Sequence, residues 1–88
     1  MASYKIEIKK SAQKEIRKLS RDIRERVVGI IDGLYKNPIP ADSKKIKGSQ
    51  NVYRIRQGTY RIVYIVYKNE LTIIIVRVRH RKETHKDL

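Results

Sequence analysis

Arginine alternates with apolar residues between Val52 and Arg81. Of all the patterns in the chain, this one is best suited to form a binding or catalytic site. The runs VYRIR, TYRIVY and IIIVRVRHR carry arginines at alternating positions. Alternate side chains of a β-strand point to the same face, so strands here would hold a row of cations at set spacings. Guanidinium groups held at set spacings suit the oxygens of phosphate groups. The pattern therefore predicts a shaped site for an anionic partner.

The overall charge points to a polyanionic partner as well. Lys and Arg total 22 against 9 Asp and Glu in 88 residues, a formal charge of +13. Such an excess favours RNA, DNA, an anionic membrane surface or an acidic protein as the partner. There is no cysteine, which excludes disulfides, thiolate metal sites and cysteine nucleophiles.

The sequence contains neither a membrane-spanning segment nor a convincing set of metal ligands. The N-terminal residues MASYKIEIKK are charged and contain no apolar stretch, and no run approaches the length of a membrane-spanning helix. We therefore expect a cytoplasmic protein with no membrane partner. His80 and His85 are the only histidines and form a poor metal pair, so we expect no metal and no cofactor.

The elements that must position the arginines begin with a strand and two helices. Apolar and charged residues alternate over residues 4–8, which predicts a half-buried strand. Helical periodicity follows, with Ser11 and Ser20 as expected N-caps and Asn37, before a proline, as the expected end. The apolar stripes are Ala12, Ile16 and Leu19 in the first helix and Ile23, Val27, Ile30, Ile31 and Leu34 in the second. Residues 37–51 are expected to form a mobile basic connector.

A hairpin is predicted at Gly58-Thr59, where a two-residue type II′ loop needs a positive φ at the glycine. This loop places Arg56 opposite Arg61, with Arg54 opposite Val63 and Ile55 opposite Ile62. Opposed like charges destabilise a sheet by a few tenths to about 1 kcal/mol. Such a conflict is typical of a functional site.

A second turn is predicted at residues 68–70, as a three-residue loop with Asn69 in the left-handed region. It places Tyr67 opposite Leu71 and Arg61 opposite Arg77, whereas a two-residue loop would turn the last strand over. The preferred register collects on one face Arg54, Arg56, Arg61, Arg77, Arg79 and Arg81. It leaves for the helices to cover Thr72, Ile74, Val76 and Val78.

These elements predict an α+β fold in a single domain over residues 1–88. An N-terminal strand and a helical hairpin precede a three-stranded antiparallel meander, and the strands form one sheet with the helices packed on one face. The position of the first strand in the sheet stays open.

In this order the motifs resemble the RelE/ParE toxin superfamily, and its RelE-type mRNA interferases in particular. The resemblance covers nearly the whole chain, and its most specific parts are residues 45–48 (KIKG), 53–56 (YRIR), 58–64 (GTYRIVY) and 78–85 (VRHRKETH). It implies a RelE-like toxin of a type II toxin-antitoxin pair. Such toxins inhibit translation by cutting mRNA in the ribosomal A site without a metal, and a small antitoxin holds them inactive. The implied partners are thus the ribosome and an acidic antitoxin.

The resemblance also implies roles for particular residues. The family's basic strand positions fall on Arg54 and Arg56, its central arginine on Arg61, the arginine that closes the last strand on Arg81, and its C-terminal tyrosine on His85. Arginine keeps the charge of the family's lysines but cannot give up a proton near neutral pH, so it cannot replace a lysine acting as a base.

Metal-free RNA cleavage would proceed by attack of the 2′-OH on the adjacent phosphorus to give a 2′,3′-cyclic phosphate. Arg61 and Arg81 are the candidates for stabilising charge on the phosphoryl oxygens. Only the two histidines titrate near neutral pH, and His85 is preferred over His80 for proton transfer because it occupies the family's tail position. The expected contacts to RNA or the ribosome are Lys44, Lys45, Lys47, Arg77, Arg79, His80 and Lys82. The tyrosines of the meander, Tyr53, Tyr60, Tyr64 and Tyr67, are expected to pack within the sheet.

Two other functions stay open. A ParE-like member of the superfamily would bind DNA gyrase and cleave nothing, and a noncatalytic RNA-binding or ribosome-associated module would also carry this charge. The grouped arginines favour the nuclease, since an inhibitor that binds a protein has no need of convergent phosphate donors.

Overall fold

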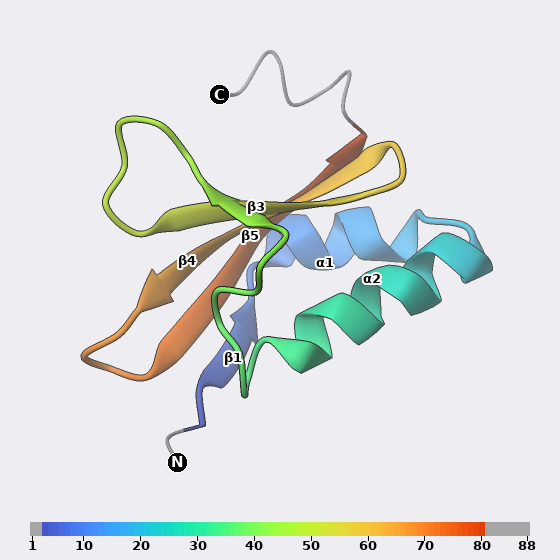
Figure 1. The fold of residues 1–88 in the computed structure, drawn as a ribbon. Helices are drawn as coiled ribbons and strands as arrows, with labels where there is room; N and C mark the ends of the chain where they lie inside the picture. The colour runs from blue at the N-terminus through green and yellow to red at the C-terminus, as the bar shows by residue number, and fades with distance from the viewer. Residues whose placement is uncertain (1–2, 81–88) are drawn as a thin grey trace.

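The computed structural model describes residues 3–80, which fold into one sheet and two helices (Figure 1). In chain order the elements are β1 (Lys5–Ile8), α1 (Lys10–Arg17), α2 (Arg21–Gly33), β2 (Ser43–Lys45), β3 (Val52–Gln57), β4 (Tyr60–Tyr67) and β5 (Thr72–His80). The strands lie in the order β1-β5-β4-β3-β2, and all neighbours are antiparallel except β1 and β5. The predicted α+β architecture is confirmed.

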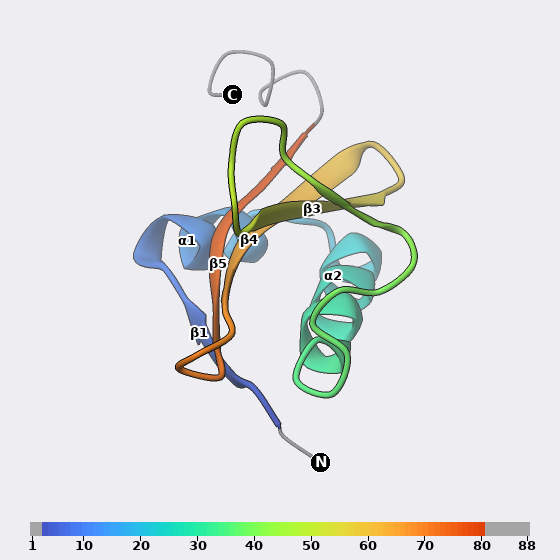
Figure 2. The ribbon, with the colours of Figure 1, turned by 60° about the vertical axis from the view of Figure 1, so that its left-hand side comes forward.

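β1 takes the position that the sequence left open. It pairs in parallel with β5, from Lys5 opposite Thr72 to Ile8 opposite Ile75 (Figure 2). Two parallel neighbouring strands require a crossover connection. Here the chain leaves β1, passes through both helices and reaches β2 at the opposite edge of the sheet. It then returns strand by strand along β3, β4 and β5.

Both helices pack against the same face of the sheet. The predicted stripes are confirmed, since Ala12, Ile16, Leu19, Val27, Ile31 and Leu34 are buried and Ile23 and Ile30 are partly buried against them. The strands contribute Tyr53, Ile55, Ile62, Tyr64, Val66, Ile73, Ile75 and Val78 to the same cluster. Within residues 3–80, neither helix has the length and apolar character needed to cross a membrane.

The helix boundaries differ from the prediction in two places. Lys9 precedes the first turn of α1, so Ser11 is not its N-cap, and the Ser11 hydroxyl instead donates to the carbonyl of Val76 (3.2 Å). Ser20 is the N-cap of α2 as predicted. α2 ends at Gly33 rather than near Asn37, and the carbonyl of Tyr35 accepts a hydrogen bond from the N–H of Tyr4 (2.8 Å). In a longer helix the carbonyl of Tyr35 would accept a hydrogen bond from within the helix, whereas here it accepts one from the residue just before β1.

The β3–β4 hairpin has the predicted register. Gln57 lies opposite Tyr60 and Arg56 opposite Arg61, and Gly58 has a φ of 60°. The glycine therefore supplies the positive φ that the first central position of a type II′ loop requires.

The turn between β4 and β5 was predicted wrongly. It has four residues rather than three, because Tyr67 lies opposite Thr72, and Leu71 rather than Asn69 adopts the positive φ (49°). The carbonyl of Leu71 accepts a hydrogen bond from the N–H of Lys5 (2.8 Å). The start of β1 therefore bonds to the backbone of this turn.

A bulge at Val76 corrects the predicted register of β5 a second time. Tyr64 lies opposite Ile75 and Val63 opposite Arg77, so Val76 is an extra residue in β5. One extra residue reverses the alternation of side chains beyond it. The helices therefore cover Ile73, Ile75 and Val78, and the prediction for Thr72, Ile74 and Val76 was wrong. Arg61 faces Arg79 instead of Arg77, although both arginines remain on the predicted face.

The expected connector contains a short strand. β2 pairs with β3, so that Lys44 lies opposite Arg54. The hydroxyl and the N–H of Ser43 both donate to the carbonyl of Pro40 (2.7 and 2.9 Å), which closes a turn just before the strand. This pairing extends the sheet to a fifth strand.

Candidate nucleic-acid interface

The face of the sheet away from the helices carries cations in two cross-strand rows, which we call the arginine face. Residues paired across strands project to the same face, and neighbouring strands lie about 4.8 Å apart. One row contains Lys44, Arg54, Val63 and Arg77, and the next contains Arg56, Arg61 and Arg79. The described sheet therefore holds six cations on this face, which are five of the six predicted arginines and Lys44.

One part of this face has the least balance of positive by negative charge. It consists of Arg54, Arg56 and Arg61. Burial, followed by repulsion from Arg56 and Arg61, holds the pKa of the Arg54 guanidinium below its usual value. The Nε of Arg61 is buried and has no hydrogen-bond partner within residues 3–80. Buried polar atoms in proteins nearly always have a partner. An anion bound between these three side chains would supply one and would offset their mutual repulsion.

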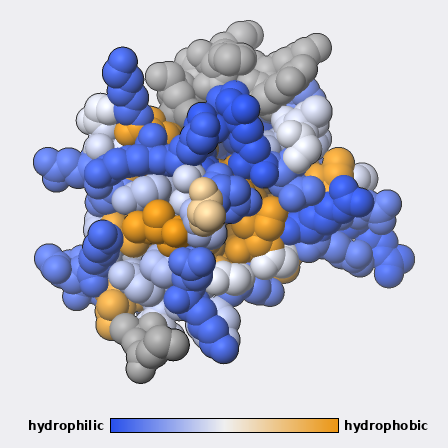
Figure 3. All heavy atoms as spheres, viewed as in Figure 1, coloured by the Kyte–Doolittle hydropathy of each residue, from blue (hydrophilic) through white to orange (hydrophobic). Residues whose placement is uncertain are grey.

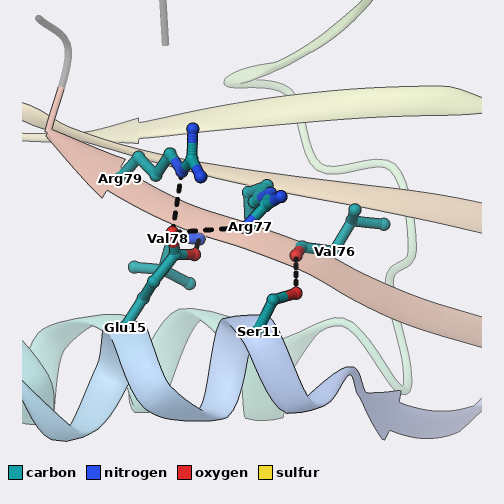
Figure 4. A network of polar contacts seen from close by, with 6 residues as sticks. All are labelled: Ser11, Glu15, Val76, Arg77, Val78 and Arg79. Atoms are coloured by element: carbon teal, nitrogen blue, oxygen red, sulfur yellow. Dashed lines mark hydrogen bonds and ion pairs between the residues drawn. The ribbon is translucent and has the colours of Figure 1, made fainter. Parts of the chain in front are cut away.

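Arg77 and Arg79 have a different environment, because a carboxylate from α1 reaches them (Figure 4). Glu15 Oε2 lies 2.7 Å from Nε of Arg79 and 3.6 Å from Nη1 of Arg77. Glu15 Oε1 accepts a hydrogen bond from the N–H of Val78 (2.9 Å). Sequence reasoning missed Glu15, although it is the only acidic residue of α1 (KSAQKEIR).

The other predicted contact residues are not all on the arginine face. Lys44 is, whereas Lys45 pairs with Tyr53 and so projects to the other face. Lys47 is exposed in the segment after β2. His80 pairs with Tyr60, and the two rings meet edge to face with centroids 5.4 Å apart. The predicted Arg81, Lys82 and His85 lie outside the described residues.

Two tyrosines of the meander pack in the core, as expected. The rings of Tyr53 and Tyr64 stack with centroids 5.9 Å apart, and the Tyr64 hydroxyl donates to the carbonyl of Pro38 (2.9 Å). Burial is the main cause that raises the pKa of Tyr64 to about 12. Neither ring is therefore an exposed platform for a base.

A cleft in the described structure shares no residue with the arginine face. This cleft of about 280 Å³ lies at the other end of β3 and β4, between Asn51 and Glu70, and none of its lining residues is an arginine. Within residues 3–80 there is no group of three or more side chains suited to hold a metal ion. On the face shown in Figure 3, apolar patches lie between projecting hydrophilic side chains. The groups available to an anion on the arginine face are thus guanidinium and ammonium groups.

A sheet covered by a helical hairpin on one face and lined with cations on the other defines a small basic α+β protein. Comparison with known proteins gives the family. The model of the ParE toxin of type II toxin-antitoxin systems (parDE) matches residues 6–85. The chain therefore belongs to the RelE/ParE superfamily of type II toxins, and the resemblance seen in the sequence is confirmed.

Individual relatives agree with this assignment. Toxin RelE3 of Methanocaldococcus jannaschii is 40% identical over 85 residues, which cover 92% of this chain and 94% of that protein. The archaeal RelE-RelB complex from Pyrococcus horikoshii contains a chain that superposes with a TM-score of 0.81 at 28% identity, covering 90% of this chain and 96% of that one. The RelB-RelE antitoxin-toxin complex from Methanococcus jannaschii gives a TM-score of 0.78 at 35% identity, covering 93% and 98%.

Proposed function

We propose that this toxin is a ribosome-dependent mRNA endonuclease that acts without a metal in the cytoplasm and cleaves the message in the A site. The observation that carries the proposal is the buried Nε of Arg61, which has no partner within residues 3–80 and lies in a cluster with Arg54 and Arg56. Within the described residues these three guanidinium groups have no carboxylate partner, which suits them to a group that gains negative charge during a reaction.

The reaction that fits this site is an internal transfer of the phosphoryl group. The 2′-oxygen loses its proton to a base and attacks the adjacent phosphorus, while the bond from phosphorus to the 5′-oxygen breaks and that oxygen gains a proton. The products are a 2′,3′-cyclic phosphate and a 5′-OH. Charge builds on the phosphoryl oxygens, and guanidinium groups aimed at them lower the barrier.

The residues divide into two groups under this proposal. Arg54, Arg56 and Arg61 bind and stabilise the reacting phosphate together with Arg81, and His85 transfers the proton, as the resemblance implies. The proposed contacts to flanking RNA and the ribosome are Lys44, Lys45, Lys47, Arg77, Arg79, His80 and Lys82. Proton transfer by a positioned group contributes roughly a hundredfold to ten-thousandfold.

An acidic antitoxin is the proposed regulatory partner. The solved relatives from Pyrococcus horikoshii and Methanococcus jannaschii are complexes of RelE with RelB, and a charge of +13 favours rapid association with an acidic protein. Copurification from the native operon should yield such a partner, and the absence of one would refute this part of the proposal.

Cleavage of a ribosome-bound message tests the proposal directly. The toxin would be made in a cell-free translation system, and cuts would be mapped on a programmed ribosome together with the chemistry of the ends. Cyclic phosphate ends within A-site codons are expected, with weak activity on naked RNA. Intact message under translation arrest would refute the nuclease and favour the noncatalytic ribosome-binding alternative.

Inhibition of DNA gyrase is the second candidate, because the family model that matches the chain is that of the ParE toxin. A gyrase inhibitor would block supercoiling by purified gyrase and leave translation unaffected. The arginine face favours the nuclease, since binding a protein does not need a cluster of three guanidinium groups in which one buried Nε has no partner among residues 3–80.

A further inference from the structure

Glu15 holds three groups of β5 with one carboxylate. The side chains of Glu15 and Arg79 are only 19% and 20% exposed, and their ion pair is short (2.7 Å). The pair with Arg77 is longer (3.6 Å), and Arg77 is 39% exposed. The second oxygen of Glu15 accepts the N–H of Val78. Arg79 is thus held tightly and Arg77 more loosely.

These contacts belong to a polar seam between α1 and the outer edge of β5. β1 pairs with β5 only as far as Ile75, so the edge beyond it has no strand neighbour within residues 3–80. Ser11 and Glu15 lie four residues apart on one face of α1 and bond to the carbonyl of Val76 and the N–H of Val78 (Figure 4). The carboxylate is therefore fixed by the backbone of the strand whose arginines it contacts.

The arginine face is divided electrostatically as a result. A partly buried ion pair is screened by salt less than a surface pair is, so a phosphate must compete with Glu15 for Arg79. Within residues 3–80, no carboxylate forms an ion pair with Arg54, Arg56 or Arg61. Burial, and then repulsion from its two neighbours, lowers the pKa of Arg54. Phosphates gain more from these three cations than from the two that Glu15 holds.

We propose that Glu15 is a positioning residue of the RNA interface: it limits the contribution of Arg79 and Arg77 and so centres the phosphate contacts on Arg54, Arg56 and Arg61. This inference rests on the proposed binding of RNA by the arginine face. The arginines of this face, which alternate in the same way along their strands, would therefore contribute unequally to phosphate binding.

The salt dependence of RNA binding tests the proposal. Glu15→Gln removes the charge and keeps an oxygen that can accept the N–H of Val78. Each phosphate contact to single-stranded RNA adds about 0.7 to the slope of log affinity against log salt. Release of one or both arginines should therefore steepen the slope by about 0.7 to 1.4, which is about a 2.6-fold to 7-fold larger loss of affinity between about 50 and 200 mM salt. Ser11→Ala removes a contact of the same seam without a change of charge and should leave the slope unaltered.

A second comparison leaves Glu15 in place, so it decides the matter even if Glu15→Gln impairs folding. Arg56→Gln should reduce the slope by about 0.7, whereas Arg79→Gln should reduce it by less than half as much. In the double variant of Glu15→Gln and Arg79→Gln, the slope should be less steep than in Glu15→Gln alone by about 0.7. Equal effects of Arg79→Gln and Arg56→Gln would overturn the proposal.

The outcomes separate this inference from the function on which it rests. The probe is a short single-stranded RNA oligomer added to the purified toxin. Absence of binding by the unaltered protein would overturn RNA recognition and this inference together. Binding with an unchanged slope in folded Glu15→Gln would overturn the role of Glu15 alone, and a merely structural role would lower thermal stability without changing the slope.

Discussion

Arg56 lies directly opposite Arg61 across the β3–β4 hairpin. Like charges at directly opposed positions destabilise a sheet, and Arg54 adds a third charge that repels both. The fold therefore maintains this cluster at a cost in stability. We expect substitutions here to separate stability from activity.

Replacing Arg56 with threonine should stabilise the fold and impair the toxin. Relief of the opposed charges should raise the free energy of unfolding by a few tenths to about 1 kcal/mol, as measured by urea denaturation, while cleavage of ribosome-bound message falls. Lys45→Thr is the matched control for stability, since Lys45 lies on an exposed strand opposite Tyr53 and should give no such gain. A less stable Arg56→Thr would contradict the account.

Replacing Arg61 with glutamine should reduce cleavage by roughly a hundredfold to a thousandfold, the usual effect of removing one donor to a developing anion. Arg61→Lys should recover little, because lysine keeps the charge but lacks the planar fork of donors. Single-turnover cleavage on programmed ribosomes is the measurement, with circular dichroism to check folding. Arg17→Gln, on an exposed position of α1, is the control, and near-normal cleavage by Arg61→Gln would remove Arg61 from the site.

Replacing Leu71 with glycine should stabilise the protein. Leu71 has a φ of 49° and is 40% exposed, so the substitution relieves a left-handed conformation that costs a non-glycine residue about 1 kcal/mol and loses little burial. A higher midpoint of thermal unfolding is expected. Asn69→Gly serves as the control, because Asn69 does not have a positive φ, and it should give no increase. Equal gains from both substitutions would contradict this explanation.

The stability of the fold should decrease in strong alkali because of Tyr64. The pKa of this phenol is raised to about 12 in the folded protein, against about 10 in an unfolded chain, so the fold favours the protonated form. Its contribution is complete below about pH 10 and is lost as the pH rises through 12. Tyr64→Phe should flatten the dependence of thermal stability on pH in this range. A Tyr64→Phe variant that keeps the full alkaline loss would assign it to other groups.

Local patterns predicted much of the fold. The stripes from Ala12 to Leu34 and the glycine at position 58 are local signals, and they fixed the helix faces and the hairpin register. The predicted register of β5 was wrong because a four-residue turn and the bulge at Val76 depend on contacts with β1 and α1, such as that of Ser11 with Val76. These partners are more than sixty residues away in the chain.

Local sequence patterns also predicted the interface only in part. The alternation of arginines predicted which face they share. Each of the two corrections to β5 shifts the register by one residue, so together they cancel and leave Arg77 and Arg79 on the predicted face. Periodicity describes one strand at a time, so it could not show that a carboxylate on α1 pairs with two of the arginines. Glu15 could have been singled out only as the one acid in a basic helix.

The parallel pairing of β1 with β5 has a consequence for the synthesis of the protein. Lys5 pairs with Thr72, so the sheet cannot be completed until almost the whole described chain has been made. Contacts between residues so far apart in the sequence form slowly. The strand that contributes Arg77 and Arg79 is the last of the described strands to be made. A nascent chain therefore lacks Arg77 and Arg79, and with them part of the arginine face, until β5 has been made.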